Sequence, residues 1–198
     1  STATTMMFSR HARDHAHLVR MSAIVILIAN IMVMIRIGIV AGIVAPTLIL
    51  PVATVFACGI VPGLALTLYS WRTLVDLVGA VEMREAELKT AVSFGLLYAV
   101  VLLASAWLQD IAGNSGVFIV AMVSGLTDAD ASVLSSLRMF NLQKLAGDGA
   151  VIAVTLALMA NLVFKIGLVL SIGGTNLARH ALPGLLAIGG GMAAGLLL

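Results

Sequence analysis

The sequence predicts an all-α fold, a polytopic membrane helix bundle of about six transmembrane helices plus a truncated N-terminal helix. Two observations support this prediction. Of the 198 residues, 61% are hydrophobic and only 10% are charged, a composition that excludes an ordinary soluble domain. The apolar residues also gather into runs of about 20, and a helix of that length crosses the hydrocarbon layer with its backbone hydrogen bonds satisfied.

Six apolar segments are long enough to cross the membrane. The first two meet at Pro46, which ends the first helix and leaves almost no loop. The fourth follows a glycine-containing turn, GNSG, and the last follows another, GGTN. Between the second and third, residues 71–89 are too polar to cross, and the spacing of their apolar residues predicts a short helix on the inner membrane surface. The expected spans are residues 21–44, 47–69, 90–108, 115–137, 150–172 and 179–198.

The cations predict an orientation, because Lys and Arg that flank membrane spans are retained in the cytoplasm. If the N-terminus is cytoplasmic, only Arg179 of the cations outside the spans is expected on the external side. The cations expected on the cytoplasmic side are Arg10, Arg13, Arg20, Arg72, Arg84, Lys89, Arg138 and Lys144.

Two parts of the sequence resemble each other and predict an internal repeat. In the first span AN is followed by RIG from position 36, and in the fifth span AN is followed by KIG from position 165. Upstream, STATTMMFSR aligns with ADASVLSSLR. We interpret these as repeat A, about 1–70, and repeat B, about 115–198, within one transmembrane domain of residues 1–198. Four predicted crossings separate the copies, so they are expected to be parallel. The alternative is that the two segments resemble each other by convergence, because apolar helices use few types of residue.

The stretches GLTDADASVLSSLR, ANLVFKIGL, STATTMMFSRHAR and ANIMVMIRI resemble the C-terminal membrane domain of unknown function of MgtC/SapB-type bacterial membrane proteins. The similarity covers nearly the whole chain. It implies a multi-pass protein of the bacterial inner (plasma) membrane, with the cytoplasmic N-terminus expected above. It also implies that this chain is part of a longer protein, in which an MgtC-like membrane segment precedes residue 1. The resemblance implies no established substrate.

Charged residues inside the expected spans are candidates for a functional site. An uncompensated charge at the bilayer centre costs about 3 to more than 10 kcal/mol, so such residues face protein or water. Asp128 and Asp130 in the fourth span balance Arg36 and Lys165 in the first and fifth.

On an intact helix, Ser124, Asp128 and Ser132 form one polar stripe, from which Asp130 lies about 200° away. Either the helix unwinds locally, or the two aspartates face different neighbours.

Two asparagines are expected beside these charges. Asn161 and Lys165 are one helical turn apart on a common face. Asn30 and Arg36 diverge by about 120°, so Asn30 is expected to face the core while Arg36 points elsewhere. We predict that Asp128 pairs with Lys165 or lies near it, and that the two asparagines face each other across the core of the bundle.

The site residues predict two functions. The first is a transporter or channel-like domain for a small ion, a divalent cation such as Mg²⁺ being one candidate, or for a solute. In it, Asp128, Asp130, Asn30, Asn161, Lys165, Arg36, Ser124 and Ser132 would bind the ligand. The second is a non-transporting regulator or scaffold, in which the same charges fix helix register and faces with small-xxx-small spacing, such as Gly191 with Gly195, contact other membrane proteins or a second copy.

No soluble-enzyme motif is found in the sequence: it has no phosphate-binding loop, HExxH or nucleophile elbow. We therefore expect no enzyme activity, no cofactor and no nucleic-acid partner, and we expect the lipid bilayer to be the main surrounding of the chain.

Overall fold

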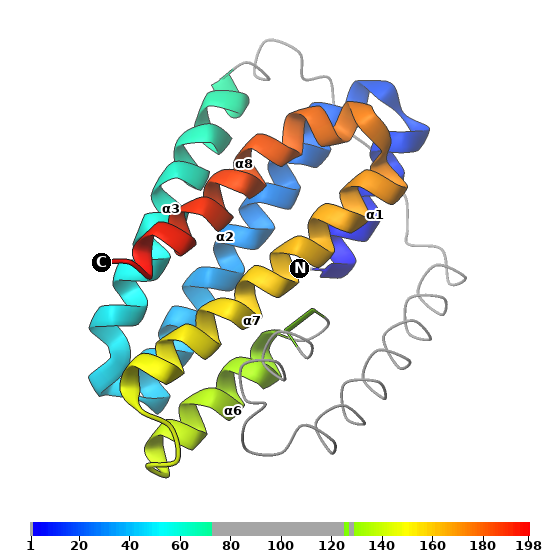
Figure 1. The fold of residues 1–198 in the computed structure, drawn as a ribbon. Coiled ribbons are helices and arrows are strands. Elements are labelled where there is room, and N and C mark those ends of the chain that lie inside the picture. Colours follow the sequence, from blue (N-terminus) through cyan, green and yellow to red (C-terminus); the bar gives the residue numbers. More distant parts are fainter. Residues whose placement is uncertain (1, 73–124, 127–128) are drawn as a thin grey trace.

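The computed structural model describes residues 2–72, 125–126 and 129–198, and within these ranges all regular structure is helical, as the sequence predicts. Figure 1 shows the long helices side by side in a bundle. The helices are α1 (Thr2–Asp14), α2 (Val19–Val44), α3 (Ile49–Arg72), α6 (Ala129–Asn141), α7 (Gly147–Leu168) and α8 (Gly174–Gly195).

Three helical stretches in the described ranges are long and apolar enough to cross a membrane: Ala16–Val44, Pro46–Arg72 and Gly147–Gly195. The third contains α7 and α8, and Figure 1 shows that the chain reverses direction between them. The reversal lies at a π-helical turn, Val169–Gly173, followed by Gly174 with φ +72°, a conformation that favours glycine. The chain is an integral membrane protein, because these apolar helices match the thickness of a bilayer.

Four of the six expected spans correspond to α2, α3, α7 and α8, with boundaries that differ by a few residues. The expected span 90–108, most of the surface helix 71–89 and the first part of the span 115–137 lie outside the described residues. The last part of that span belongs to α6, which has 13 residues and continues to Asn141.

Proline fixes the corner between α2 and α3. Ala45 leaves the helical region, with φ −138° and ψ 74°, because a residue that precedes proline is disfavoured there. Pro46 then begins a short 3-10 turn that leads into α3. The side chain of Asn141, at the end of α6, donates a hydrogen bond of 2.7 Å to the carbonyl oxygen of Val44, so the ends of α2 and α6 are joined.

Glycines allow the backbones of α3 and α8 to come into direct contact. A Cβ atom on Gly191 would lie 2.0 Å from the carbonyl oxygen of Cys58, and one on Gly195 would lie 2.8 Å from the Cα atom of Val55. On the facing helix, a Cβ atom on Gly63 would lie 2.5 Å from the Ile188 side chain. The small-xxx-small spacing in this sequence therefore serves packing within the chain.

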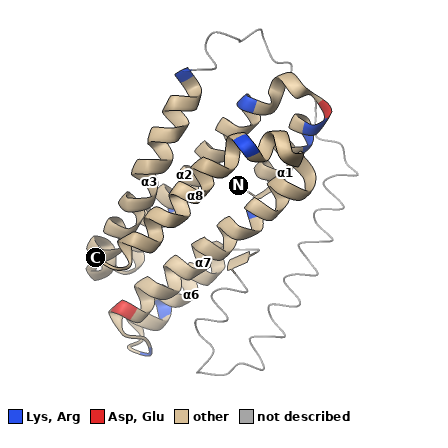
Figure 2. Cartoon of the chain, turned by 45° about the horizontal axis from the view of Figure 1, so that its top comes forward, with Lys and Arg blue, Asp and Glu red and all other residues tan. Residues whose placement is uncertain are grey.

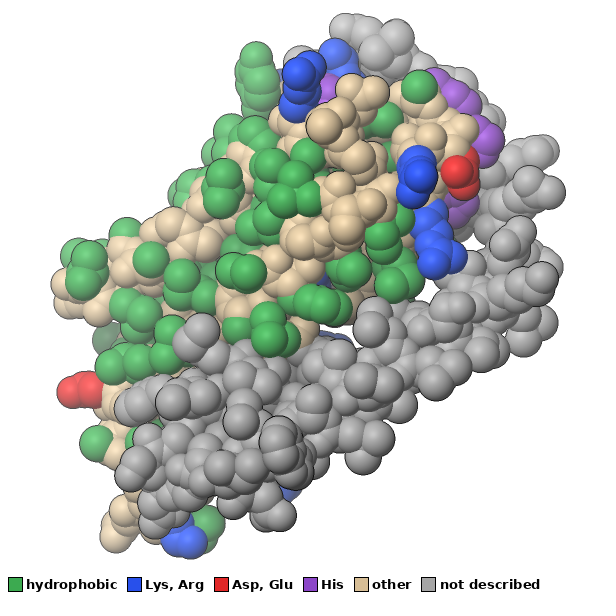
Figure 3. All heavy atoms as spheres, turned by 45° about the vertical axis from the view of Figure 1, so that its right-hand side comes forward, with side chains coloured by type: hydrophobic (Ala, Val, Ile, Leu, Met, Phe, Trp, Pro, Cys, Tyr) green, Lys and Arg blue, Asp and Glu red, His purple; other side chains and the backbone are tan. Residues whose placement is uncertain are grey.

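Most of the charged residues lie toward the two ends of the bundle (Figure 2), and hydrophobic side chains cover much of the described part of the face seen in Figure 3. Examples of strongly exposed apolar side chains are Ile43, Leu50 and Val61, which are 75%, 77% and 65% exposed. This distribution is inverted relative to a soluble protein and matches a surface in contact with lipid.

The expected grouping of cations is wrong. Arg20 lines one pocket with Tyr69, Ser70 and His180. The starts of α2 and α8 and the last turn of α3 therefore lie at the same end of the bundle. Arg179 therefore lies on the side of Arg20 and Arg72, not opposite to them. Arg138 and Lys144 lie at the other end, because α6 finishes against the end of α2. The prediction assumed two complete spans between residues 72 and 147, which would have returned the chain to the same side.

The two segments paired in the expected repeat also run in opposite directions. Lys165 near the end of α7 meets Asn30 in the middle of α2, whereas Gly147 at the start of α7 lies against Leu48, just beyond the end of α2. The α1–α2 and α6–α7 pairs are thus inverted, and the expectation of parallel copies is wrong for the same reason as the cation grouping. The duplication itself stays a prediction.

Candidate functional site in the membrane

A buried hydrogen bond joins α2 and α7 in the middle of the bundle. The ammonium Nζ atom of Lys165 donates to the Oδ1 atom of Asn30 over 2.8 Å. Lys165 is only 1% exposed and Asn30 only 5%. Asn30 lies 11 residues after the start of α2 and 14 before its end, which is roughly 16 Å and 21 Å along the helix. The contact is therefore at mid-depth, where a charge is most costly.

Local helix geometry explains the pair. The Cα–Cβ bonds of a helix tilt toward its N-terminus, so the Lys165 side chain extends back along α7 toward the bundle centre. The amide nitrogen Nδ2 of Asn30 donates to the carbonyl oxygen of Ile26 one turn earlier, over 2.8 Å. That bond fixes the amide so that its oxygen faces α7 and accepts from Lys165. Burial of Asn30 agrees with the expectation that it faces the core and diverges from Arg36.

Asn161 lies one turn before Lys165 and connects α7 to a third segment. Its Nδ2 atom donates to the carbonyl oxygen of Leu126 over 3.4 Å. The neighbouring Gly125 makes this approach possible, because a Cβ atom there would lie 2.5 Å from the carbonyl oxygen of Ala157.

Asn30, Asn161 and Lys165 line one small cavity. Its volume is about 10 Å³, enough for about one water molecule. The other walls are apolar and come from α2, α7 and α8: Val33, Met34, Leu158, Leu162, Ile188 and Met192. The two asparagines thus share a cavity, with the lysine between α2 and α7.

A second charged contact joins α2 and α6. The Nη2 atom of Arg36 forms an ion pair with the Oδ2 atom of Asp130. The side chains are 60% and 50% exposed, so the pair lies toward the surface of the bundle.

The remaining predicted site residues divide into two groups. Ser132 is buried on α6, at 5% exposure. Ser124 and Asp128 lie outside the described residues, so the expected pairing of Asp128 with Lys165 stays a prediction. The sequence did not predict that Asn30 accepts the hydrogen bond from Lys165. A polar residue on the buried face of α2 did indicate that Asn30 needs a hydrogen-bond partner in the core.

Comparison with known proteins shows the family of the chain. Residues 1–173 match the family described as "Domain of unknown function (DUF4010)", and the chain belongs to this family. A stretch of 95 residues is 30% identical to an uncharacterized protein of Aquifex aeolicus (strain VF5), covering 48% of this chain and 41% of that protein. No solved structure matches. The connection to MgtC/SapB-type proteins stays a prediction.

The ion pair between α2 and α6 predicts the outcome of a charge exchange. We expect Arg36→Asp alone, and Asp130→Arg alone, to lower the free energy of unfolding by about 3 kcal/mol, because each leaves two like charges together within the membrane. The double variant restores opposite charges and is expected to recover most of that loss. Unfolding in detergent with increasing denaturant measures the three values. A double variant no more stable than the singles would contradict the contact.

Proposed function

We propose that this membrane domain transports a small solute or ion through a site between α2, α7 and α8, formed by Asn30, Asn161 and Lys165. The single observation that supports it is the fully buried lysine, hydrogen-bonded to an amide and bordering a cavity at mid-depth. Ionisable residues inside a membrane are expensive and commonly mark pathways for solutes or ions. An apolar residue of similar size would serve packing at lower cost.

The charges favour an anion or a zwitterion over Mg²⁺. Arg36, Lys165 and Asp130 sum to 2 − 1 = +1 among the described charges of the site. With Asp128, whose placement is not described, the sum is 2 − 2 = 0. In neither case does the site carry the net negative charge that binds a hard divalent cation. An ammonium and two amides instead suit carboxylate or other oxygen acceptors.

Transport through this site requires the bundle to open. A cavity of about 10 Å³ holds a water molecule but no larger solute. The inverted arrangement of α1–α2 and α6–α7 supports such a motion, because inverted halves can exchange conformations and expose a central site to each side in turn.

The end of the bundle that includes the α1–α2 connection is proposed to be cytoplasmic. It carries more described cations than the other end, which has Arg138 and Lys144. The membrane is then the bacterial inner membrane with a cytoplasmic N-terminus. The cations at the proposed cytoplasmic end are Arg10, Arg13, Arg20, Arg72 and Arg179.

Flux into proteoliposomes tests the proposal. The purified chain is reconstituted and assayed with labelled chloride, phosphate, glycine and Mg²⁺. We expect uptake of an anion or of glycine, and we expect Lys165→Met to reduce it at least about tenfold, because a charge-assisted hydrogen bond contributes about 1.5–3 kcal/mol.

The matched control is Lys144→Met, which removes an exposed lysine at the end of the bundle and should leave uptake unchanged. Unfolding curves of both variants establish that they are folded. Absence of flux for every solute, or equal flux in Lys165→Met and the parent chain, would refute transport through this site.

The regulator or scaffold function has less support. Its proposed contact faces were the glycine-rich ones, and in the structure Gly191 and Gly195 face α3 of the same chain.

A further inference from the structure

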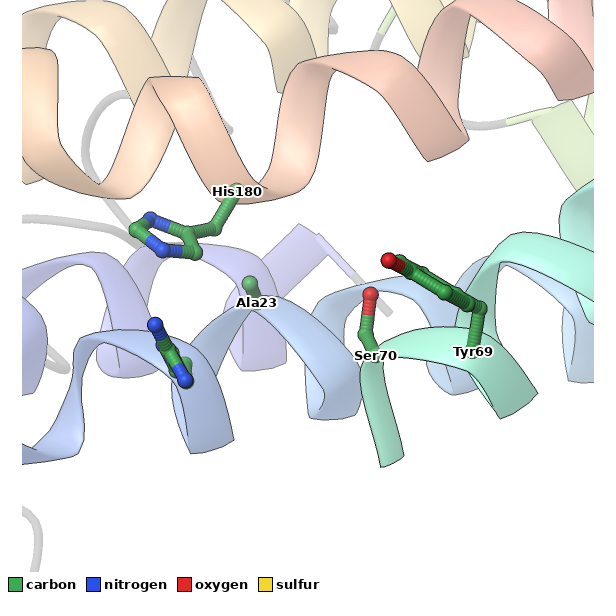
Figure 4. A pocket seen from close by; sticks show the side chains of 5 residues that line it. Ala23, Tyr69, Ser70 and His180 are labelled. Atoms are coloured by element: carbon green, nitrogen blue, oxygen red, sulfur yellow. The ribbon is translucent and has the colours of Figure 1, made fainter. Parts of the chain in front are cut away.

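A second polar pocket lies at the end of the bundle, well away from the mid-depth cavity. Its volume is about 280 Å³, and it is lined by Arg20 and Ala23 of α2, Tyr69 and Ser70 of α3, and His180 of α8 (Figure 4). No sequence motif indicates this pocket, because its residues come from three helices that are far apart along the chain. Nothing in the proposed transport site uses these side chains.

The pocket combines one cationic donor, Arg20, with side chains that can both donate and accept hydrogen bonds. Figure 4 shows the His180 ring and the Ser70 hydroxyl on opposite sides of the gap above Ala23. The Nδ1 atom of His180 lies 2.9 Å from the carbonyl oxygen of Asn176, so Nδ1 carries the proton and Nε2 is directed elsewhere. Arg20 contributes a guanidinium, which presents several donors in a planar fork that matches phosphate oxygens.

Among the described residues, the charges around the pocket are mainly positive. Arg72 and Arg179 are exposed at the same end of the bundle. Of the acidic residues within the described ranges, only Asp14 lies at this end, beside Arg10 and Arg13. The described charges at this end therefore favour an anion in the pocket.

The pocket also lies at the boundary between water and lipid. Arg20 is in the first turn of α2, and Tyr69 is in the last turn of α3, 70% exposed as is usual for tyrosine at a membrane surface. Below it on α3, Val61, Leu64 and Leu68 are 65%, 43% and 54% exposed. An acyl chain could lie along this apolar strip while its headgroup occupies the pocket.

From this arrangement we propose that the pocket binds the phosphate group of an anionic phospholipid. Arg20 forms charge-assisted hydrogen bonds to the phosphate oxygens, and His180 and the Tyr69 hydroxyl contact the rest of the headgroup. The Arg20 guanidinium selects an anionic headgroup, and the apolar strip on α3 selects a lipid over a soluble phosphate. Basic pockets at the cytoplasmic ends of membrane helices have the chemistry for this recognition.

Native mass spectrometry of the purified full chain tests the proposal. The probes are phosphatidylglycerol, phosphatidylcholine and inorganic phosphate at equal concentration. We expect phosphatidylglycerol to remain bound and the other two to dissociate. Arg20→Gln and His180→Gln are each expected to weaken phosphatidylglycerol binding about tenfold, the factor that corresponds to about 1.4 kcal/mol. Arg20→Lys keeps the charge and should retain part of the affinity.

Arg138→Gln is the matched control, because it removes an exposed arginine from the opposite end and should leave lipid binding unchanged. The substituted residues are exposed, so the variants are expected to fold, and thermal unfolding checks this. Equal retention of phosphatidylcholine would overturn the proposal, as would equal loss in Arg138→Gln. Saturation of the same site by inorganic phosphate, competing with the lipid, would also overturn it and indicate a soluble phosphate ligand.

Discussion

Gly191→Ala is expected to destabilise the protein more than its single added methyl group suggests. The new Cβ atom would lie 2.0 Å from the carbonyl oxygen of Cys58 and 2.9 Å from the Cα atom of Gly59. Both are backbone atoms, so no side chain can rotate away, and α3 and α8 must move apart. Overpacking costs about 1–3 kcal/mol where side chains adjust, and we expect the upper end of this range or more. Unfolding in detergent measures the loss.

The control is the adjacent Gly190→Ala. No atom lies within 4 Å of a Cβ atom there, and the residue is exposed. Alanine also favours helix over glycine by about 1 kcal/mol, so this variant should be as stable as the parent chain or slightly more stable. Equal stability of the two variants would contradict the close contact between α3 and α8. A Gly191→Ala chain that stays fully stable but loses a partner protein would support the scaffold function.

Asn30→Leu is the second change with a large expected effect. It removes the oxygen that accepts from Lys165 and places an apolar side chain beside the ammonium at mid-depth. Loss of a partner by a buried charged group costs about 3 kcal/mol or more. The double variant with Lys165→Met replaces both groups by apolar ones, so it should be more stable than Asn30→Leu alone. A double-mutant cycle of unfolding free energies measures the coupling.

Asn141→Leu combined with Lys165→Met is the control cycle. Asn141 bonds to Val44 at the end of the bundle, far from Lys165, so the two changes should add within about 0.5 kcal/mol. A coupling between Asn30 and Lys165 no larger than this control would show that the hydrogen bond is energetically unimportant. The transport proposal would then lose its main support.

The Lys165–Asn30 hydrogen bond and the close contact between α3 and α8 are the two structural features on which the proposed site depends. Close packing of α3 against α8 provides a rigid wall, and the cavity lies between this wall and the polar face of α7. A polar group held by fixed neighbours is preorganised for a ligand. The Gly191 and Asn30 experiments therefore probe the wall and the site separately.

The positions of the helices could be predicted from local sequence. Runs of about 20 apolar residues and Pro46 located α2 and α3, because span length and the missing proline N–H act within one segment. The polar residues in the membrane were also found from composition, since Asn30, Asn161 and Lys165 interrupt long apolar stretches. Their neighbours could not be predicted, because helical spacing gives the face of a residue but not which helix covers that face.

Apolar runs and the residues that interrupt them are enough to predict a helical membrane protein with a few charged and amide side chains at mid-depth. Hydrophobic runs and backbone hydrogen bonding require that outcome whatever the topology. The packing of the helices was needed to show that α2 and α7 run antiparallel, that Lys165 donates to Asn30, and that Arg20 and His180 line one pocket. These contacts depend on the direction in which each helix crosses the bilayer. The residues of one helix indicate its apolar face but not that direction.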